Sequence, residues 1–144
     1  MPVKLPVEIL KEYWGYTSFR SLQEEIINEV LSNNDTLALL PTGGGKSICY
    51  QIPALLQEGI CIVISPLIAL MEDQVSTLKS KGIKAIALTS GLHFSEIDTL
   101  LDNCIHGNYK FLYISPERLQ QELVQERIKQ MKISFVAVDE AHCI

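Results

Sequence analysis

Residues 37–47 read LALLPTGGGKS, and they place a short apolar run directly before a glycine-rich turn that ends in lysine and serine. Glycine has no Cβ, so successive backbone N–H groups of such a turn can point inward around the oxygens of a phosphate group. A helix that follows the turn would present its unpaired amide groups to the same anion. A strand, a phosphate-binding turn and a helix in this order predict a parallel α/β protein.

The side chains of this loop predict its ligand. Lys46 would reach the outer phosphates, and the hydroxyl of Ser47, one residue into the helix, would bind a magnesium ion that bridges them. The general pattern has glycine where this chain has Leu40, and a turn with a purely structural role is the local alternative. The loop therefore implies a nucleoside triphosphate with Mg²⁺. The residues assigned to its phosphates are Thr42, Gly43, Gly44, Gly45, Lys46 and Ser47.

A second polar motif follows the apolar run 135–138. Asp139 and Glu140 come where a strand would leave the sheet, and ligands of parallel sheets bind beyond the carboxyl ends of the strands. We expect Asp139 to hold Mg²⁺ through its water shell, and Glu140 to orient or deprotonate the water that attacks the γ-phosphate. By itself an acidic pair is more often a helix cap or a solvated turn; behind a phosphate loop it predicts catalysis.

Composition limits the remaining classes of function. The chain has 144 residues, of which 47% are hydrophobic, so one domain with a buried core is expected. Its formal net charge of −5 argues against a broad positive field, so any contact with nucleic acid must be local. The sequence has no apolar run of membrane-spanning length and no signal-like N-terminus. The four cysteines form no C-x-x-C pair and are expected to be reduced, buried and structural; they are Cys49, Cys61, Cys104 and Cys143.

Strand-like runs alternate with segments of helical length, which is typical of a parallel α/β sheet. The expected strands are 36–40, 60–64, 85–88, 111–114 and 133–138.

Two helices are expected before the first strand. One covers 7–14 and is closed by Gly15; the other runs from Ser21 to near Asn33, with Ser21 and Glu24 as a capping box. In the helix after the phosphate loop, Pro53 predicts a bend or an early end.

A Ser-Pro pair follows two of the strands. Ser65-Pro66 and Ser115-Pro116 each predict a helix start at the edge that carries the nucleotide loop, and free amide groups there would suit the backbone phosphates of a nucleic acid. Arg118, one turn further on, favours that interpretation. The local sequence fits equally well two helix starts with no further role.

Together these residues resemble the RecQ family of superfamily 2 DNA helicases, and the resemblance covers nearly the whole chain. Five motifs in the family's order carry it: 15–27, GYTSFRSLQEEII; 40–55, LPTGGGKSICYQIPAL; 65–74, SPLIALMEDQ; 113–119, YISPERL; and 137–144, AVDEAHCI, a DEAH box.

The resemblance implies roles for residues outside the phosphate loop. Tyr16 and Arg20 would sandwich the adenine ring of ATP, and Gln23 would hydrogen-bond its edge. His142 would couple the nucleotide state to the DNA-binding surface, although a lone histidine is more often structural. The family usually has Pro-Gly where this chain has Ser21-Leu22, which is expected to shift Gln23 slightly while the helix still starts at the capping box.

The resemblance also implies an architecture: an α/β P-loop NTPase of the RecA-like type, with a three-layer parallel sheet and flanking helices. We expect residues 1–144 to be the N-terminal part of the first RecA-like lobe, incomplete at its C-terminal end, with 1–35 as a leading adenine-recognition segment. The second lobe and its arginine are missing from this sequence. In the family, a later strand normally lies between the strands of 37–40 and 135–138, so its absence would leave a gap in the sheet.

The sequence thus predicts the ATP-binding portion of a RecQ-like helicase whose parent unwinds DNA, by analogy 3′ to 5′, in recombination and repair. Lys46 and Glu140 are the expected catalytic residues, ATP and Mg²⁺ the ligands, and single-stranded or forked DNA the partner of the parent. No membrane association is expected; location would be cytoplasmic in a bacterium or nuclear in a eukaryote. The isolated chain is expected to bind nucleotide weakly and not to unwind DNA. The alternatives are a stand-alone nucleotide-binding regulatory module and another nucleic-acid-dependent ATPase of the superfamily.

Overall fold

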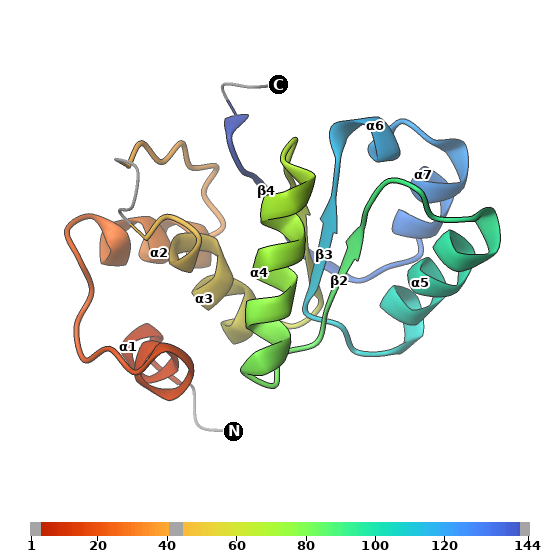
Figure 1. The fold of residues 1–144 in the computed structure, drawn as a ribbon. Helices are drawn as coiled ribbons and strands as arrows, with labels where there is room; N and C mark the ends of the chain where they lie inside the picture. The colour runs from red at the N-terminus through yellow and green to blue at the C-terminus, as the bar shows by residue number, and fades with distance from the viewer. Residues whose placement is uncertain (1–3, 41–44, 142–144) are drawn as a thin grey trace. The chain divides into compact units, whose positions relative to one another are not determined.

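The structure, a computed structural model, describes residues 4–40 and 45–141. The chain divides into two compact units, Met1–Gln57 and Glu58–Ile144 (Figure 1). The first unit is helical in the residues described, and the second contains the sheet.

The first unit opens with a helix that ends where the sequence predicts. The helix α1, Pro6–Ile9, continues directly as the π-helix η1, Leu10–Trp14, and Gly15 closes it with a left-handed φ of 76°. Proline at the first helical position suits this start, because its missing N–H would have had no partner there. Buried side chains of these two segments pack with those of α2 and α3, described below, into one core: Ile9, Leu10, Ile27, Ile48 and Ile52.

The helix α2, Gln23–Leu31, starts two residues later than expected. The predicted capping box of Ser21 and Glu24 is wrong, because the N-cap is Leu22 and no side chain caps this helix. A turn from Arg20 to Gln23 comes first: the backbone N–H of Gln23 donates to the carbonyl of Arg20 at 3.2 Å. The side chain of Gln23 accepts the N–H of Arg20 at 2.8 Å and so closes the turn from the other side.

The helix α3, Ile48–Leu56, does not end at Pro53 but continues for three more residues. A proline inside a helix removes one hydrogen bond and crowds the preceding turn, a cost of about 3 kcal/mol. Burial offsets this cost, since Ile52, Pro53 and Ala54 are all buried. Packing therefore overrides the local preference at this position.

The expected strand 36–40 does not form. These residues have no regular secondary structure, and Leu37 and Leu39 are 80% and 81% exposed. A strand needs the backbone hydrogen bonds of a neighbouring strand, and no ladder includes these residues in the part of the chain that the structure describes.

The second unit contains a parallel sheet of four strands, all with the predicted bounds. These are β1, Ile60–Ile64; β2, Ala85–Leu88; β3, Phe111–Ile114; and β4, Ile133–Val138. Their order is β2-β3-β1-β4, and every pairing is parallel. At the edge, β4 leaves Val136 and Val138 about half exposed, at 52% and 49%.

Helices cover both faces of this sheet (Figure 1). The helix α4, Ile68–Ser80, lies on one face; α5, Phe94–His106, and α7, Glu122–Ile128, lie on the other, and the short α6, Pro116–Leu119, follows β3. The α5–α7 face holds a core built from alternate strand residues and from both helices, including Ile62, Leu88, Leu112, Leu101 and Val124. These three layers confirm the α/β architecture.

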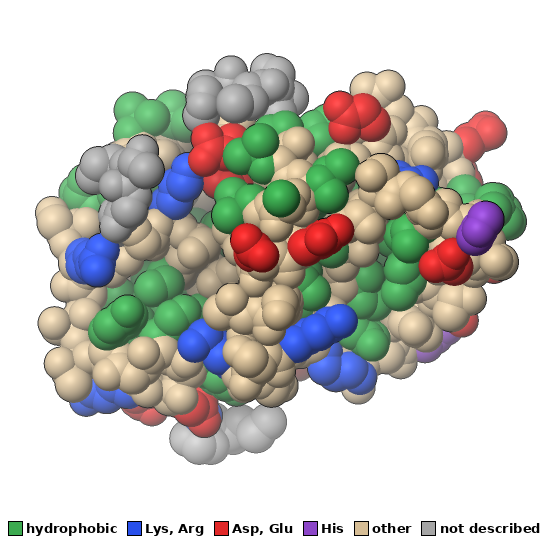
Figure 2. Space-filling model, in the orientation of Figure 1, with side chains coloured by type: hydrophobic (Ala, Val, Ile, Leu, Met, Phe, Trp, Pro, Cys, Tyr) green, Lys and Arg blue, Asp and Glu red, His purple; other side chains and the backbone are tan. Residues whose placement is uncertain are grey.

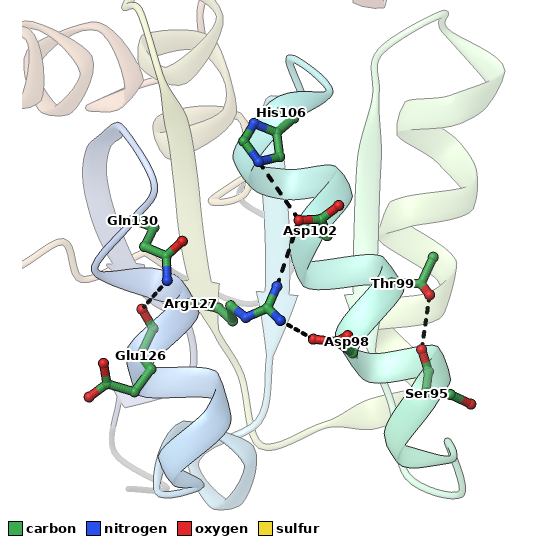
Figure 3. A network of polar contacts seen from close by, with 8 residues as sticks. All are labelled: Ser95, Asp98, Thr99, Asp102, His106, Glu126, Arg127 and Gln130. Carbon is green, nitrogen blue, oxygen red and sulfur yellow. Dashed lines mark hydrogen bonds and ion pairs between the residues drawn. The ribbon is translucent and has the colours of Figure 1, made fainter.

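A polar network joins α5 to α7 at the surface (Figure 3). The guanidinium of Arg127 on α7 forms an ion pair with Asp98 on α5, and its Nη1 lies 3.7 Å from Asp102. His106 lies 3.7 Å from the same Asp102 carboxylate, one turn further along α5. Arg127 is thus the link through which the two helices share charged contacts.

Charges of both signs are mixed on the surface. On the face drawn in Figure 2, Lys and Arg side chains are interspersed with Asp and Glu, and the coloured residues form no broad area of one sign. Among the residues that the structure describes, no helix has the length and apolar character that crossing a membrane requires.

Candidate nucleotide-binding site

The end of the phosphate loop and the start of α3 occupy the place that the sequence predicts. Ser47 is the N-cap of α3, rather than a residue inside it, and its side chain makes no capping hydrogen bond. Lys46 precedes it, and the carbonyl of Lys46 accepts the backbone N–H of Cys49 at 3.1 Å. Lys46 and Ser47 therefore stand at the N-terminal end of the helix, where the helix dipole favours an anion. Thr42, Gly43 and Gly44 lie outside the described residues.

Gln23 and Gly45 are brought into direct contact. The side-chain amide of Gln23 donates to the carbonyl of Gly45 at 3.0 Å, while its oxygen accepts the N–H of Arg20. Gln23 is only 2% exposed. Gly45 has a φ of 74°, and a Cβ at this position would lie 2.4 Å from Nε2 of Gln23. Glycine is thus required here both by the backbone conformation and by the close approach of Gln23.

Tyr16 and Arg20, the other two residues that the resemblance assigns to adenine, lie near Gln23 in the sequence. Their surroundings differ from each other. Arg20 lines a hollow of about 480 Å³ together with Phe19, Leu22 and Glu24. Tyr16 is 55% exposed and does not belong to that lining. The stacking of Tyr16 and Arg20 on adenine stays a prediction.

The acidic pair follows β4 directly. The N–H of Asp139 donates to the carbonyl of Ile64 at 2.8 Å, which extends the β1–β4 ladder past the strand end. The Asp139 carboxylate accepts the N–H of Glu140 at 3.0 Å, and Glu140 has a left-handed φ of 53°. A glutamate in this conformation is strained by roughly 1–2 kcal/mol, a cost often found at functional sites. His142 lies outside the described residues.

The two halves of the predicted site belong to different units. Lys46 and Ser47 are in Met1–Gln57, and Asp139 and Glu140 are in Glu58–Ile144. Their convergence on one nucleotide stays a prediction.

The two Ser-Pro helix starts differ from each other. The hydroxyl of Ser115 accepts the N–H of Arg118 at 3.2 Å, so it caps α6 as predicted. The prediction that Ser65 caps a helix that Pro66 starts is wrong: α4 begins at Ile68 with Leu67 as N-cap, and Ser65 instead accepts the N–H of Leu67 at 3.3 Å. Both serines are buried, and both hydroxyls accept hydrogen bonds from backbone N–H groups of their own segment.

The three cysteines that the structure describes are free and buried, as predicted: Cys49, Cys61 and Cys104; Cys143 lies outside the described residues. Burial raises the pKa of Cys49 to about 11 and that of Cys104 to about 12, and it raises the pKa of Cys61 as well. Thiols that keep their protons at neutral pH are poor nucleophiles and poor metal ligands. These three residues are therefore structural.

The residues present fit a nucleotide with a divalent cation. The positive φ of Gly45 suits a backbone that turns around a phosphate group. The hydroxyl of Ser47 makes no capping hydrogen bond, and it is a suitable oxygen ligand for Mg²⁺. The described residues contain no cluster of three or more metal-binding side chains. In nucleotide sites Mg²⁺ is held by one or two protein oxygens together with phosphates and water, so such a cluster is not needed.

A parallel α/β sheet with a glycine-lysine-serine helix start defines a nucleotide-binding class of protein. The family model for DEAD/DEAH box helicases matches residues 20–144. The chain belongs to the DEAD/DEAH box helicase family.

Similar proteins narrow this description. The chain is 50% identical over 138 residues to a probable ATP-dependent DNA helicase RecS of Bacillus subtilis. This match covers 95% of this chain and 27% of the relative. It is 47% identical to the ATP-dependent DNA helicase RecQ of Pasteurella multocida, over 96% of this chain and 22% of the relative. The chain thus spans about a quarter of the length of these relatives.

A solved structure supports the fold. The DUF1998 helicase MrfA matches 99% of this chain and 24% of its own, with a TM-score of 0.72 and 17% sequence identity.

One contact at the sheet edge was not predicted from sequence. The guanidinium of Arg118 donates to the backbone carbonyl of Thr89, 29 residues away. No sequence pattern marks a carbonyl as the partner of a distant arginine, so only the structure reveals it.

Proposed function

We propose that this chain is the ATP-binding portion of an ATP-dependent DNA helicase of the RecQ type. The observation that carries the proposal is the hydrogen bond from Gln23 to Gly45, which ties the predicted adenine motif to the phosphate loop within one unit. The similarity to RecQ and RecS helicases supports DNA as the nucleic acid. The parent would bind single-stranded or forked DNA and unwind duplex DNA 3′ to 5′ in recombination and repair, in the cytoplasm of a bacterium or the nucleus of a eukaryote.

The roles of the residues follow from their chemistry. Lys46 would bind the outer phosphates of ATP and stabilise the charge that develops during transfer of the γ-phosphoryl group. The Ser47 hydroxyl and the Asp139 carboxylate would hold Mg²⁺, which supplies charge neutralisation when bound. Glu140 would orient the attacking water and accept its proton. Tyr16, Arg20 and Gln23 would bind adenine, and His142 would couple the nucleotide state to DNA.

DNA would lie against the carboxyl edge of the sheet, where Ser65, Pro66, Ser115 and Arg118 follow β1 and β3. We propose that the isolated chain binds nucleotide weakly and neither hydrolyses ATP nor unwinds DNA at a measurable rate, because it spans only about a quarter of the length of its RecQ and RecS relatives.

A titration with a fluorescent ATP analogue tests the phosphate role of Lys46. Charge-assisted hydrogen bonds contribute about 1.5–3 kcal/mol, so Lys46→Ala should weaken Mg²⁺-dependent binding roughly 10- to 100-fold. Lys11→Ala, which removes an exposed lysine of the same unit, is the matched control and should bind as the wild type does. Unchanged binding by the Lys46→Ala variant would contradict the proposal.

A further inference from the structure

Arg118 makes three hydrogen bonds at the carboxyl edge of the sheet. Its Nη2 donates to the carbonyl of Thr89 at 2.7 Å, and its Nη1 donates to Oε1 of Gln121 at 3.3 Å. Its backbone N–H donates to the hydroxyl of Ser115 at 3.2 Å, so the residue is fixed at both ends. The residue as a whole is half-buried.

The bond to Thr89 joins two neighbouring strand ends. The strands β2 and β3 are adjacent and parallel, and their last residues, Leu88 and Ile114, are register partners. The chain segments that follow them therefore leave the sheet side by side at the same edge. Thr89 begins the segment after β2 and Ser115 begins the segment after β3, so the side chain of Arg118 bridges the two.

The segment that Arg118 holds is suited to contact a single strand. Ser90 and Gly91 are exposed, and Gly91 has a φ of 82° with open space around its Cα. The segment leads into α5, whose first residue, Phe94, is 71% exposed. Hydroxyl and backbone donors bind phosphates, and an exposed aromatic ring offers a surface on which a base can stack.

We propose that Arg118 is a positioning residue, which holds the loop from Thr89 to Gly91 against the α6 start so that this loop contacts DNA. The inference rests on the proposed function, which supplies the DNA strand. The hydrogen bonds to Thr89 and Gln121 use two of the five N–H donors of the guanidinium, so the side chain is held by its neighbours in the fold. In this proposal the loop, rather than the arginine, contacts the phosphates.

Two measurements on Arg118→Ala test the proposal. Backbone amide order parameters of residues 89–91, measured by NMR without DNA, should fall, because the loop loses its hydrogen bond to the arginine. Binding of a single-stranded thymidine oligonucleotide should weaken about fivefold, with an unchanged slope of log affinity against log salt concentration. Loss of a direct phosphate contact would instead reduce that slope by about 0.7.

Lys79→Ala is the matched control. It removes one positive charge from the last turn of α4, at the opposite edge of the sheet, and should change neither the order parameters of the loop nor the salt slope. Unchanged loop order parameters in Arg118→Ala, or a slope reduced by about 0.7, would overturn the positioning role. If the wild type does not bind the oligonucleotide, the DNA part of the inference is overturned, whereas the ATP role of Lys46 stands or falls by its own titration.

Discussion

Leu22 has a backbone conformation that a leucine side chain disfavours. It has a φ of 71° and a ψ of −16° at the third position of the Arg20–Gln23 turn, a conformation that glycine adopts without strain. The RecQ family usually has glycine at this position. The turn forms with leucine at this position, and Gln23 hydrogen-bonds both the N–H of Arg20 and the carbonyl of Gly45. The leucine is therefore accommodated with backbone strain, and the expected small shift of Gln23 stays a prediction.

We predict that Leu22→Gly is more stable than Leu22→Ala. A left-handed conformation costs an L-residue about 1–2 kcal/mol, and the extra unfolded-state entropy of glycine offsets about half of that gain. Leu22 is 52% exposed, so about half of it is buried, and the glycine and alanine variants lose the same side-chain contacts. In urea denaturation the free energy of unfolding of Leu22→Gly should therefore exceed that of Leu22→Ala by roughly 0.5–1 kcal/mol at unchanged m-value.

Leu22→Ala is the control for this prediction. Alanine keeps the strain and loses the leucine contacts, so this variant should not be more stable than the wild type. Equal stability of the glycine and alanine variants would mean that the turn is not strained at Leu22.

At the scale of elements, the sequence best predicts the helices and strands whose formation depends on their own local composition. The strands β1, β2, β3 and β4 have the predicted bounds because each is a short apolar run that is bounded by polar or turn residues. Residues 36–40 look equally strand-like, yet they form no ladder among the described residues. Strand formation depends on a neighbouring strand as much as on composition. The sequence of one segment does not indicate whether such a neighbouring strand is present.

The packing of α5 on α7 gives the next prediction. Arg127 is the half-buried member of its ion pairs, with 25% of its side chain exposed, and it contacts both Asp98 and Asp102 (Figure 3). Arg127→Met keeps a long apolar stem but removes the charge, so it should lower the free energy of unfolding by about 1 kcal/mol. Thermal or urea unfolding measures this loss, which should shrink at high salt concentration.

A matched variant separates this network from ordinary surface charge. Lys129 pairs with Glu126 at 3.4 Å, but both side chains are more than 60% exposed. Lys129→Met should therefore change stability by less than about 0.5 kcal/mol. If both variants lose the same amount, the Arg127 contacts add nothing beyond an exposed pair.

At the scale of the whole molecule, the predicted site is better defined by chemistry than by geometry. Lys46, Ser47, Asp139 and Glu140 could be chosen from sequence because their residue types and order are dictated by phosphate and magnesium chemistry. The contact of Gln23 with Gly45 could not, because it depends on how α2 packs beside the start of α3. Motifs thus predict which groups act, whereas packing determines how they are held.

The buried thiols predict how the stability of the whole chain depends on pH. Folding raises the pKa of Cys49 to about 11 and that of Cys104 to about 12, from an ordinary value near 9. Above pH 9 the unfolded chain therefore binds fewer protons than the folded chain at these positions. The stabilisation that depends on the protonated thiols is complete below about pH 9 and is lost as the pH rises toward the folded pKa values.

Cys104→Ala isolates the contribution of one thiol. Between about pH 10 and 11, the free energy of unfolding of the wild type should fall more steeply than that of the variant, by about 1.4 kcal/mol per pH unit, because only the wild type releases the Cys104 proton on unfolding. Urea unfolding at a series of pH values measures both slopes, and the variant's lower stability at pH 7 does not affect the comparison. Parallel curves would mean that the thiol of Cys104 titrates as freely in the folded chain as in the unfolded one, which its burial beside Leu101 and Ile97 in the α5–α7 core argues against.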